Sequence, residues 1–335
     1  MEKRGCLSLV LGIALVGSMF GNLMLLVLFL VTIAASEEGN TTLSPIRFDE
    51  RVVQKAVSSE DKIAVISIRG VIASSEEGHS GESMVEETKY ALQQALEDKA
   101  VKAIILSIDS PGGEVTASDV LYHAVKVARE KKPVVIYMNS MAASGGYYIA
   151  CAGTHLMASN TTWTGSIGVI IQTMNYRELL GKVGLSSVVF KSGKFKDMMN
   201  GAREMTEDEK AYMQKMVMQS YGRFVGIVAN ERKLDEKTLR EGIADGRIIS
   251  GEDALEAKLI DEIGYIEDAY DRARKLGNAN GAAVVEYRPS YGFAKLFQIF
   301  GKASKPQKVE LSLNGSVGLN LQPGRWYYLP GHLVP

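Results

Sequence analysis

The chain has 335 residues, of which 46% are hydrophobic and 23% are charged, a balance typical of globular proteins. Its formal net charge of −1 lacks the basic excess of nucleic-acid-binding domains, so we expect no nucleic-acid partner. Two cysteines, Cys6 and Cys151, and four scattered histidines exclude a disulfide framework and a zinc site, and we expect no metal or other cofactor.

The N-terminus, residues 1–35, has the features of a membrane anchor. Lys3 and Arg4 precede an uncharged stretch of 31 residues, Gly5 to Ala35. About 20 apolar residues cross a bilayer, whereas a cleavable signal peptide usually has an apolar region of about 7–15. The two basic residues predict a cytoplasmic N-terminus, with the chain after residue 36 on the extracytoplasmic side. The alternative is a secretion signal cut near Ala34 and Ala35.

Residues 36–60 are polar and mixed and are predicted to form a linker. The following segment, 61–289, alternates short apolar runs with stretches of helical spacing, which predicts a layered α/β domain. The predicted strands are 63–68, 101–108, 133–138, 155–158, 188–190 and 283–287. The predicted helices are 84–98, 116–130, 175–183, 204–231, 250–258 and 266–276. Residues 290–335 form a predicted C-terminal tail that is partly flexible.

Three glycine-rich motifs each follow a predicted strand: Ser110-Pro-Gly-Gly113, Ala143-Ser-Gly-Gly146 and Thr164-Gly-Ser-Ile-Gly168. They lack the Lys-Ser/Thr pair of a P-loop and the GxGxxG pattern, which argues against a nucleotide site. A serine at a strand-to-helix junction, as at Ser144, has an exposed hydroxyl and a free backbone N–H after it. With a second N–H near Gly113, such a site would stabilise an oxyanion. The alternative is that Ser144 only caps a helix.

A nucleophilic serine needs a base, and no histidine stands out near the predicted strand ends. A lysine can serve when burial lowers its pKa to roughly 7–8. Ser192-Gly-Lys-Phe-Lys-Asp197 offers Lys194 and Lys196, and local physics does not choose between them. A solvated basic loop is the alternative for this segment.

These motifs, in this order, resemble the half-length form of signal peptide peptidase A, the S49 class of serine proteases. The resemblance covers roughly residues 60–280 and includes Asp245-Gly-Arg-Ile-Ile-Ser-Gly251. It implies roles for five residues: Ser144 as nucleophile, Lys196 as general base, Ser166 as the residue that orients the lysine, and Gly113 and Gly145 as oxyanion donors.

The resemblance also implies a crotonase/Clp protease-like α/β fold and a ring-shaped homo-oligomer in the bacterial cell membrane. Its expected partners are peptide substrates, signal peptides among them. The helix at 204–231 carries more apolar residues than one buried stripe requires, which is typical of an interface or of a deeply buried helix. Three alternatives remain: a Ser-Lys protease dedicated to one partner, a catalytically silent Clp-like scaffold, and a crotonase-type acyl-CoA enzyme, which the predicted topology disfavours.

Overall fold

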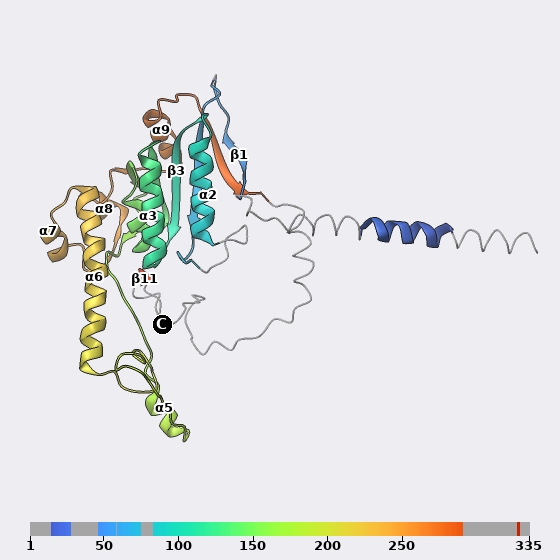
Figure 1. Ribbon diagram of the computed structural model, residues 1–335. Helices are drawn as coiled ribbons and strands as arrows, with labels where there is room; N and C mark the ends of the chain where they lie inside the picture. Colours follow the sequence, from blue (N-terminus) through green and yellow to red (C-terminus); the bar gives the residue numbers. More distant parts are fainter. Residues whose placement is uncertain (1–14, 28–45, 58, 75–82, 291–326, 329–335) are drawn as a thin grey trace, which may run out of the picture. The chain divides into compact units, whose positions relative to one another are not determined.

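The computed structural model describes residues 15–27, 46–57, 59–74, 83–290 and 327–328 (Figure 1). The chain divides into two units, Met1–Pro45 and Ile46–Pro335. The second unit contains the sheet, the remaining helices and all the residues singled out above for catalysis.

In the first unit, residues 15–27 form a helix with exposed side chains. Within the described ranges, no helix has both the length and the hydropathy that a membrane span needs. The predicted anchor extends over Gly5 to Ala35, and its residues 5–14 and 28–35 lie outside the described residues. The anchor therefore stays a prediction.

A mixed sheet forms the centre of the second unit (Figure 1). Its strand order is β1-β10-β2-β3-β5-β6-β9, and β7 pairs with β5 and with β8. The pairs from β10 to β9 are parallel, as is β5 with β7, whereas β1 with β10 and β7 with β8 are antiparallel. The strands of this sheet are β1 (Phe48–Gln54), β2 (Lys62–Arg69), β3 (Val101–Ser110), β5 (Val134–Ala143), β6 (His155–Ala158), β7 (Trp163–Gly165), β8 (Ile248–Ser250), β9 (Glu262–Ile263) and β10 (Ala283–Pro289).

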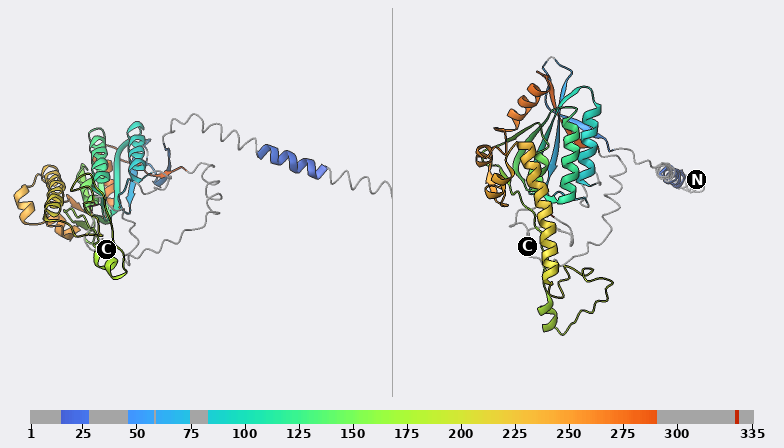
Figure 2. Two further views of the ribbon diagram at one scale, coloured as in Figure 1. Left: turned by 60° about the horizontal axis from the view of Figure 1, so that its bottom comes forward. Right: turned by 60° about the vertical axis from the view of Figure 1, so that its left-hand side comes forward.

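Helices cover both faces of the sheet (Figure 2). Residues of α2, α3, α4 and α6 share one apolar core with one face of β2, β3 and β5, and α9 packs on the opposite face. Successive residues of β2 alternate between these cores, Ala64 and Ile66 in the first and Ile63 and Val65 in the second. The helices are α2 (Met84–Glu97), α3 (Val115–Arg129), α4 (Gly145–Ala150), α5 (Arg177–Lys182), α6 (Glu207–Arg232), α7 (Glu236–Glu241), α8 (Gly251–Glu256) and α9 (Ile266–Leu276).

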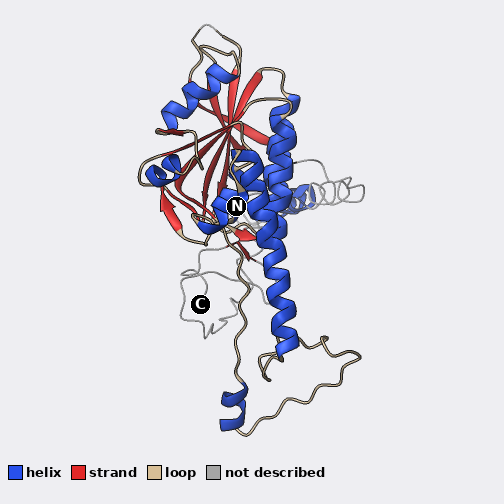
Figure 3. Cartoon of the chain, turned by 90° about the vertical axis from the view of Figure 1, so that its left-hand side faces the viewer, coloured by secondary structure: helices blue, strands red, loops and turns tan. Residues whose placement is uncertain are grey.

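The long helix α6 is buried in its C-terminal half and extends beyond the sheet in its N-terminal half (Figure 3). Phe224 and Val225 are fully buried, whereas Tyr212 and Met218 are 46% and 48% exposed. Thr206 and Glu209 form a capping box that begins the helix. The surplus of apolar residues predicted for this helix is therefore only partly explained by burial within one chain.

The α/β prediction is confirmed, and most predicted elements lie within a few residues of observed ones. The predicted strand at 188–190 is wrong, because these residues form no strand and Phe190 is 95% exposed. The predicted linker contains a strand, β1, which pairs with β10. Within the predicted tail, residues 327–328 form β11 (Tyr327–Tyr328), and the other residues after 290 lie outside the described residues.

Candidate active site

Ser144 lies between the end of β5 and the start of α4. The chain turns from sheet to helix within this one residue, whose φ of 52° and ψ of −113° are rare outside glycine. Such a conformation costs about 1–3 kcal/mol and persists only where the surroundings impose it. Here Ser144 N donates to Gly165 O at 2.9 Å, and Ser144 O accepts from Tyr148 N at 2.8 Å.

The exposed hydroxyl expected at Ser144 is wrong for the single chain, because this hydroxyl is buried; it has no hydrogen-bond partner among the described residues. It also makes no cap hydrogen bond to α4, in contrast to the helix-capping hydroxyls of Ser83, Thr206 and Ser250. The alternative in which Ser144 serves as a helix cap is therefore not what the structure shows. A buried polar atom without a partner is costly and calls for a functional explanation.

Strand register brings Ser166 beside Ser144. β5 and β7 are parallel, and their last residues, Ala143 and Gly165, are paired. Ser144 and Ser166 are the residues that directly follow these strand ends. Ser166 is buried, has a φ of 50°, and donates from its backbone N to Arg247 O at 2.7 Å. Side-chain hydrogen bonds from Arg247 lower the pKa of Asp245 to about 2, so both residues are ionised. This ion pair lies in the turn whose Arg247 carbonyl accepts the hydrogen bond from Ser166.

Gly113 and Gly145 also lie close together. A methyl group added at Gly145 would be 3.1 Å from Gly113 N and 2.5 Å from Ser118 Oγ. As the first residue of α4, Gly145 has a backbone N–H without a partner inside the helix. The structure thus brings Ser144, Ser166, Gly113 and Gly145 to one end of the sheet.

Lys196 lies elsewhere, in the segment between α5 and α6. This segment extends away from the sheet (Figure 3). The Lys196 side chain is exposed, and no hydrogen bond or ion pair to it occurs within the described ranges. Because the Ser144 hydroxyl has no partner either, the two groups form no hydrogen bond within one chain.

The neighbouring lysines are engaged in ion pairs. Lys194 Nζ lies 3.1 Å from Asp208 Oδ2, and Lys191 Nζ lies 2.7 Å from Asp197 Oδ1. Of the two lysines that the sequence offered as a base, Lys196 is thus the one whose amine is uncommitted in the described part of the chain.

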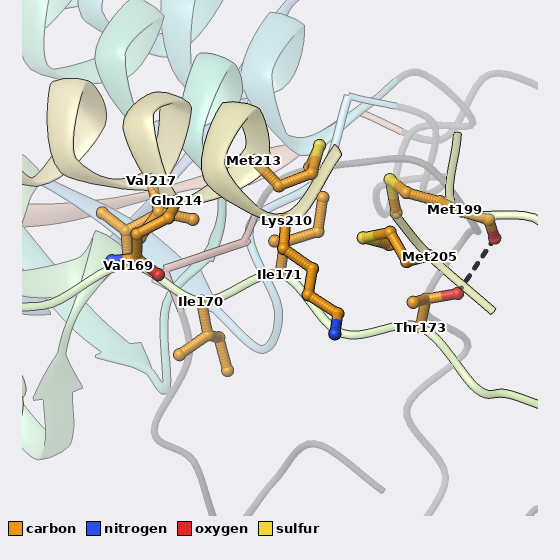
Figure 4. Close-up of a pocket in the computed structure, with 10 residues that line it drawn as sticks. All are labelled: Val169, Ile170, Ile171, Thr173, Met199, Met205, Lys210, Met213, Gln214 and Val217. Atoms are coloured by element: carbon orange, nitrogen blue, oxygen red, sulfur yellow. Dashed lines mark hydrogen bonds between the residues drawn. The ribbon is translucent and has the colours of Figure 1, made fainter. Parts of the chain in front are cut away.

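An open apolar cavity of about 380 Å³ lies between the segment that follows Ser166 and the N-terminal half of α6 (Figure 4). Methionine and β-branched aliphatic side chains dominate its walls, and Met199, three residues after Lys196, is one of them. Its lining residues are Val169, Ile170, Ile171, Thr173, Met199, Met205, Lys210, Met213, Gln214 and Val217. Methionine adapts its shape to irregular apolar groups, so the cavity suits a varied apolar side chain.

A second strand pair flanks Gly113. β4 (Gly113–Glu114) pairs antiparallel with β11, with Tyr328 opposite Gly113 and Tyr327 opposite Glu114. The β4 edge beside Ser144 therefore accepts an extended segment of polypeptide.

Two features of the site were missed from the sequence. Ser118, buried on α3, packs against Gly145 and donates to Glu114 O at 2.8 Å. Arg203 contacts both Asp197 and Glu209, and only the Thr206–Glu209 capping-box spacing gave a local signal for this region. The contact of Ser118 with Gly145 and that of Arg203 with Glu209 each join two different elements. No local sequence pattern predicts such contacts.

Comparisons with known proteins agree with this geometry. The family model described as Clp protease matches residues 76–164, which include Gly113 and Ser144. The model described as peptidase family S49 matches residues 126–280, which include Ser144, Ser166 and Lys196.

Relatives of the chain carry protease names. A protein of Enterococcus faecium that bears the name signal peptide peptidase SppA is 36% identical over 88% of this chain and 91% of its own length. A protein of Synechocystis named as a protease is 41% identical over 65% of this chain and 76% of its own length. The chloroplastic serine protease SPPA of Arabidopsis thaliana is 31% identical over 65% of this chain and 33% of its own length.

The fold and these relatives define the chain as a protease of the serine class. It belongs to peptidase family S49.

The close approach of the Ile72 backbone to Gly113 predicts that no larger residue fits at position 113. A methyl group there would lie 1.9 Å from Ile72 O, which accepts from Glu114 N at 2.7 Å, so Gly113→Ala forces the backbone to shift. If Ser144 is the nucleophile and Gly113 an oxyanion donor, as the resemblance implies, labelling of Ser144 by a fluorophosphonate should slow by about 100-fold or more. The control is Gly181→Ala, where a methyl group meets nothing within 4 Å. Equal labelling of both variants would contradict the expectation.

Proposed function

We propose that the chain is a membrane-anchored serine endopeptidase that hydrolyses remnant signal peptides and other apolar peptides through a Ser-Lys dyad. In this proposal Ser144 is the nucleophile and Lys196 the general base. Ser166 orients the lysine amine, and the backbone N–H groups of Gly113 and Gly145 bind the oxyanion.

The observation that carries the proposal is the buried Ser144 hydroxyl without a partner, on a strained strand-to-helix turn. A cap or a core hydroxyl would be hydrogen-bonded. A nucleophile must instead present its oxygen to a base and a substrate that are absent from a single chain. The same turn leaves the N–H of Gly145 at the start of α4, next to Gly113, as an oxyanion site requires.

The proposed chemistry proceeds through an acyl-enzyme. The neutral amine of Lys196 takes the proton of Ser144 Oγ while that oxygen forms a bond to the scissile carbonyl carbon. The tetrahedral intermediate collapses as the peptide C–N bond breaks, and the lysine ammonium gives its proton to the leaving amine. Water, deprotonated by the same amine, then attacks the ester and releases the acid and Ser144.

Two features support an extended apolar substrate. β11 occupies one edge of β4 and Ile72 is bridged to the other, so a substrate peptide would pair with β4 in place of β11, with its scissile bond near Ser144. The methionine-lined cavity next to the segment after Ser166 suits an apolar side chain of that peptide. The name of the Enterococcus faecium relative supports signal peptides as the substrate class.

We further propose that the dyad forms between protomers of a ring-shaped homo-oligomer. Neither the Ser144 hydroxyl nor the Lys196 amine has a partner among the described residues of one chain, and the segment that carries Lys196 extends away from the sheet. This segment, together with α5 and the residues just before it, exposes large apolar side chains, which a second copy would cover. They include Met174, Leu179, Val183, Leu185, Val188, Val189 and Phe190.

The dyad predicts the effects of three substitutions. Ser144→Ala and Lys196→Ala should each lower kcat for a synthetic signal peptide by about 10⁴-fold or more, since members of a catalytic unit act together. The double variant should be little worse than either single one. Lys194→Ala, which removes an exposed ion pair with Asp208 and a contact with the Phe195 ring, should keep most of the activity.

The same assay includes a pH series. An amine acts as a base only after it has lost its proton, so the rate should rise with pH between about pH 6 and about pH 10. Ser166→Ala should lower kcat by about tenfold or more because the amine loses an orienting partner. A flat pH profile, or an inactive Lys194→Ala beside an active Lys196→Ala, would show the wrong base.

A complementation experiment tests the shared site. Ser144→Ala and Lys196→Ala proteins are mixed under conditions that allow subunit exchange, which fluorescence transfer between labelled protomers verifies. Each mixed interface with intact Ser144 on one side and intact Lys196 on the other should be active, so part of the wild-type rate should return. If exchange is complete and the mixture stays inactive, both groups act within one chain.

The predicted topology is tested on spheroplasts. With the anchor at residues 1–35, an externally added protease should digest the domain after residue 36, while a cytoplasmic marker protein stays intact. Digestion only after lysis would place the domain on the cytoplasmic side and would also remove the access to signal peptides that the proposal needs.

A further inference from the structure

Arg203 links the segment that carries Lys196 to the long helix α6. Its Nε lies 2.8 Å from Asp197 Oδ2 and its Nη2 lies 2.8 Å from Asp197 Oδ1. The same guanidinium contacts Glu209, with Nη1 at 2.9 Å from Oε2 and Nη2 at 2.5 Å from Oε1. Arg203 therefore binds two carboxylates at once, and one of them belongs to the residue next to Lys196.

The Glu209 end of this bridge is fixed to the helix. Glu209 is 2% exposed and accepts from the backbone N of Thr206 at 2.9 Å, as part of the capping box. Its position is thus set by the start of α6. Through Arg203, the position of Asp197 is set by the same helix.

The Asp197 end constrains the backbone as well as the side chain. Arg203 Nη2 also donates to Asp197 O at 3.2 Å. Lys191 Nζ donates to Asp197 Oδ1 at 2.7 Å and to Lys194 O at 3.2 Å, so the turn before Lys196 is held to the same carboxylate. The Asp197 side chain is only 10% exposed although the neighbouring Lys196 is exposed. The turn is therefore anchored on both sides of Lys196.

These ion pairs persist at the pH of catalysis. Arg203 lowers the pKa of Glu209 to about 2, with a further contribution from the Thr206 backbone. Arg203 and then Lys191 hold the pKa of Asp197 well below its usual range. Carboxylates with lowered pKa stabilise the fold above their ordinary pKa and lose this effect only as the pH falls toward the lowered value. The bridge stays ionised in neutral and alkaline solution.

We propose that Arg203, clamped between Asp197 and Glu209, is a positioning residue that sets the place and direction of Lys196 relative to α6. The inference rests on the proposed role of Lys196 as base. A guanidinium satisfies two carboxylates in fixed planar geometry, which a lysine ammonium does not reproduce. Catalysis by a base on a protruding segment depends on such a clamp, since a displacement of about 1 Å can cost about 100-fold in rate.

The test uses the full chain in detergent micelles and a synthetic signal peptide. Arg203→Lys keeps the charge but loses the two-sided clamp, and Asp197→Asn removes the carboxylate next to the base. We expect both variants to lower kcat by on the order of 10- to 100-fold while KM changes less than about threefold.

The matched control is Arg177→Lys. Arg177 ion-pairs with Glu204 at 2.8 Å on the same segment, and neither Asp197 nor Glu209 is among its partners. This variant should retain wild-type kcat and pH profile. Thermal unfolding, followed by circular dichroism, is measured for every variant.

The outcomes separate the inference from the proposed function. An active Lys196→Ala protein would overturn the proposed function, and the positioning role with it. An inactive Lys196→Ala protein beside Arg203→Lys and Asp197→Asn variants with wild-type kcat would overturn the positioning role alone. A fall in activity that matches the unfolded fraction, with an unchanged kcat for the folded fraction, would assign Arg203 to stability and would likewise overturn it.

Discussion

Between two parallel neighbours, β3 and β7, the chain leaves β5 at Ala143 and begins α4 at Gly145. One residue has to make that change of direction, and Ser144 does so at a positive φ. Its backbone N stays bonded to Gly165, so the turn is held by the sheet on one side and by the helix on the other. In this turn the hydroxyl forms no cap hydrogen bond to α4, and Ser166, Gly113 and Gly145 lie at the same end of the sheet.

The two residues of the proposed dyad are held in place by different parts of the structure. Ser144, Ser166 and the two glycines lie at strand ends in a sheet covered on both faces, where register determines their separation. Lys196 lies on an exposed segment that contains no strand of the sheet. Such a segment needs its own fixation, and the ion pairs of Arg203 with Asp197 and Glu209 tie it to a helix whose other end is in the core. A neighbouring protomer would complete both halves.

Sequence reasoning succeeded where burial dominates. The runs 63–68 and 101–108 are apolar because both faces of their strands are covered, and they correspond to β2 and β3. The prediction of strands from the sequence failed where strand formation depends on a neighbouring strand. Val188–Phe190 have high β propensity but no strand beside them, whereas β1 is largely exposed and owes its conformation to pairing with β10. The short strands β7 and β8 were missed because each is only three residues long and depends on its neighbour.

The sequence by itself determined the α/β class, the strand-to-helix junction at Ser144 and the order of the glycine-rich motifs, because these depend on local propensity and on hydrophobic period. For the proposed base, local patterns offered Lys194 and Lys196 equally, and only the family resemblance favoured Lys196. Only the tertiary structure decided that Ser144 and Ser166 are adjacent, that the Ser144 hydroxyl is buried without a partner, and that Lys194 is engaged with Asp208 while Lys196 is not. These facts depend on strand register and on contacts between residues distant along the chain, which no local pattern encodes.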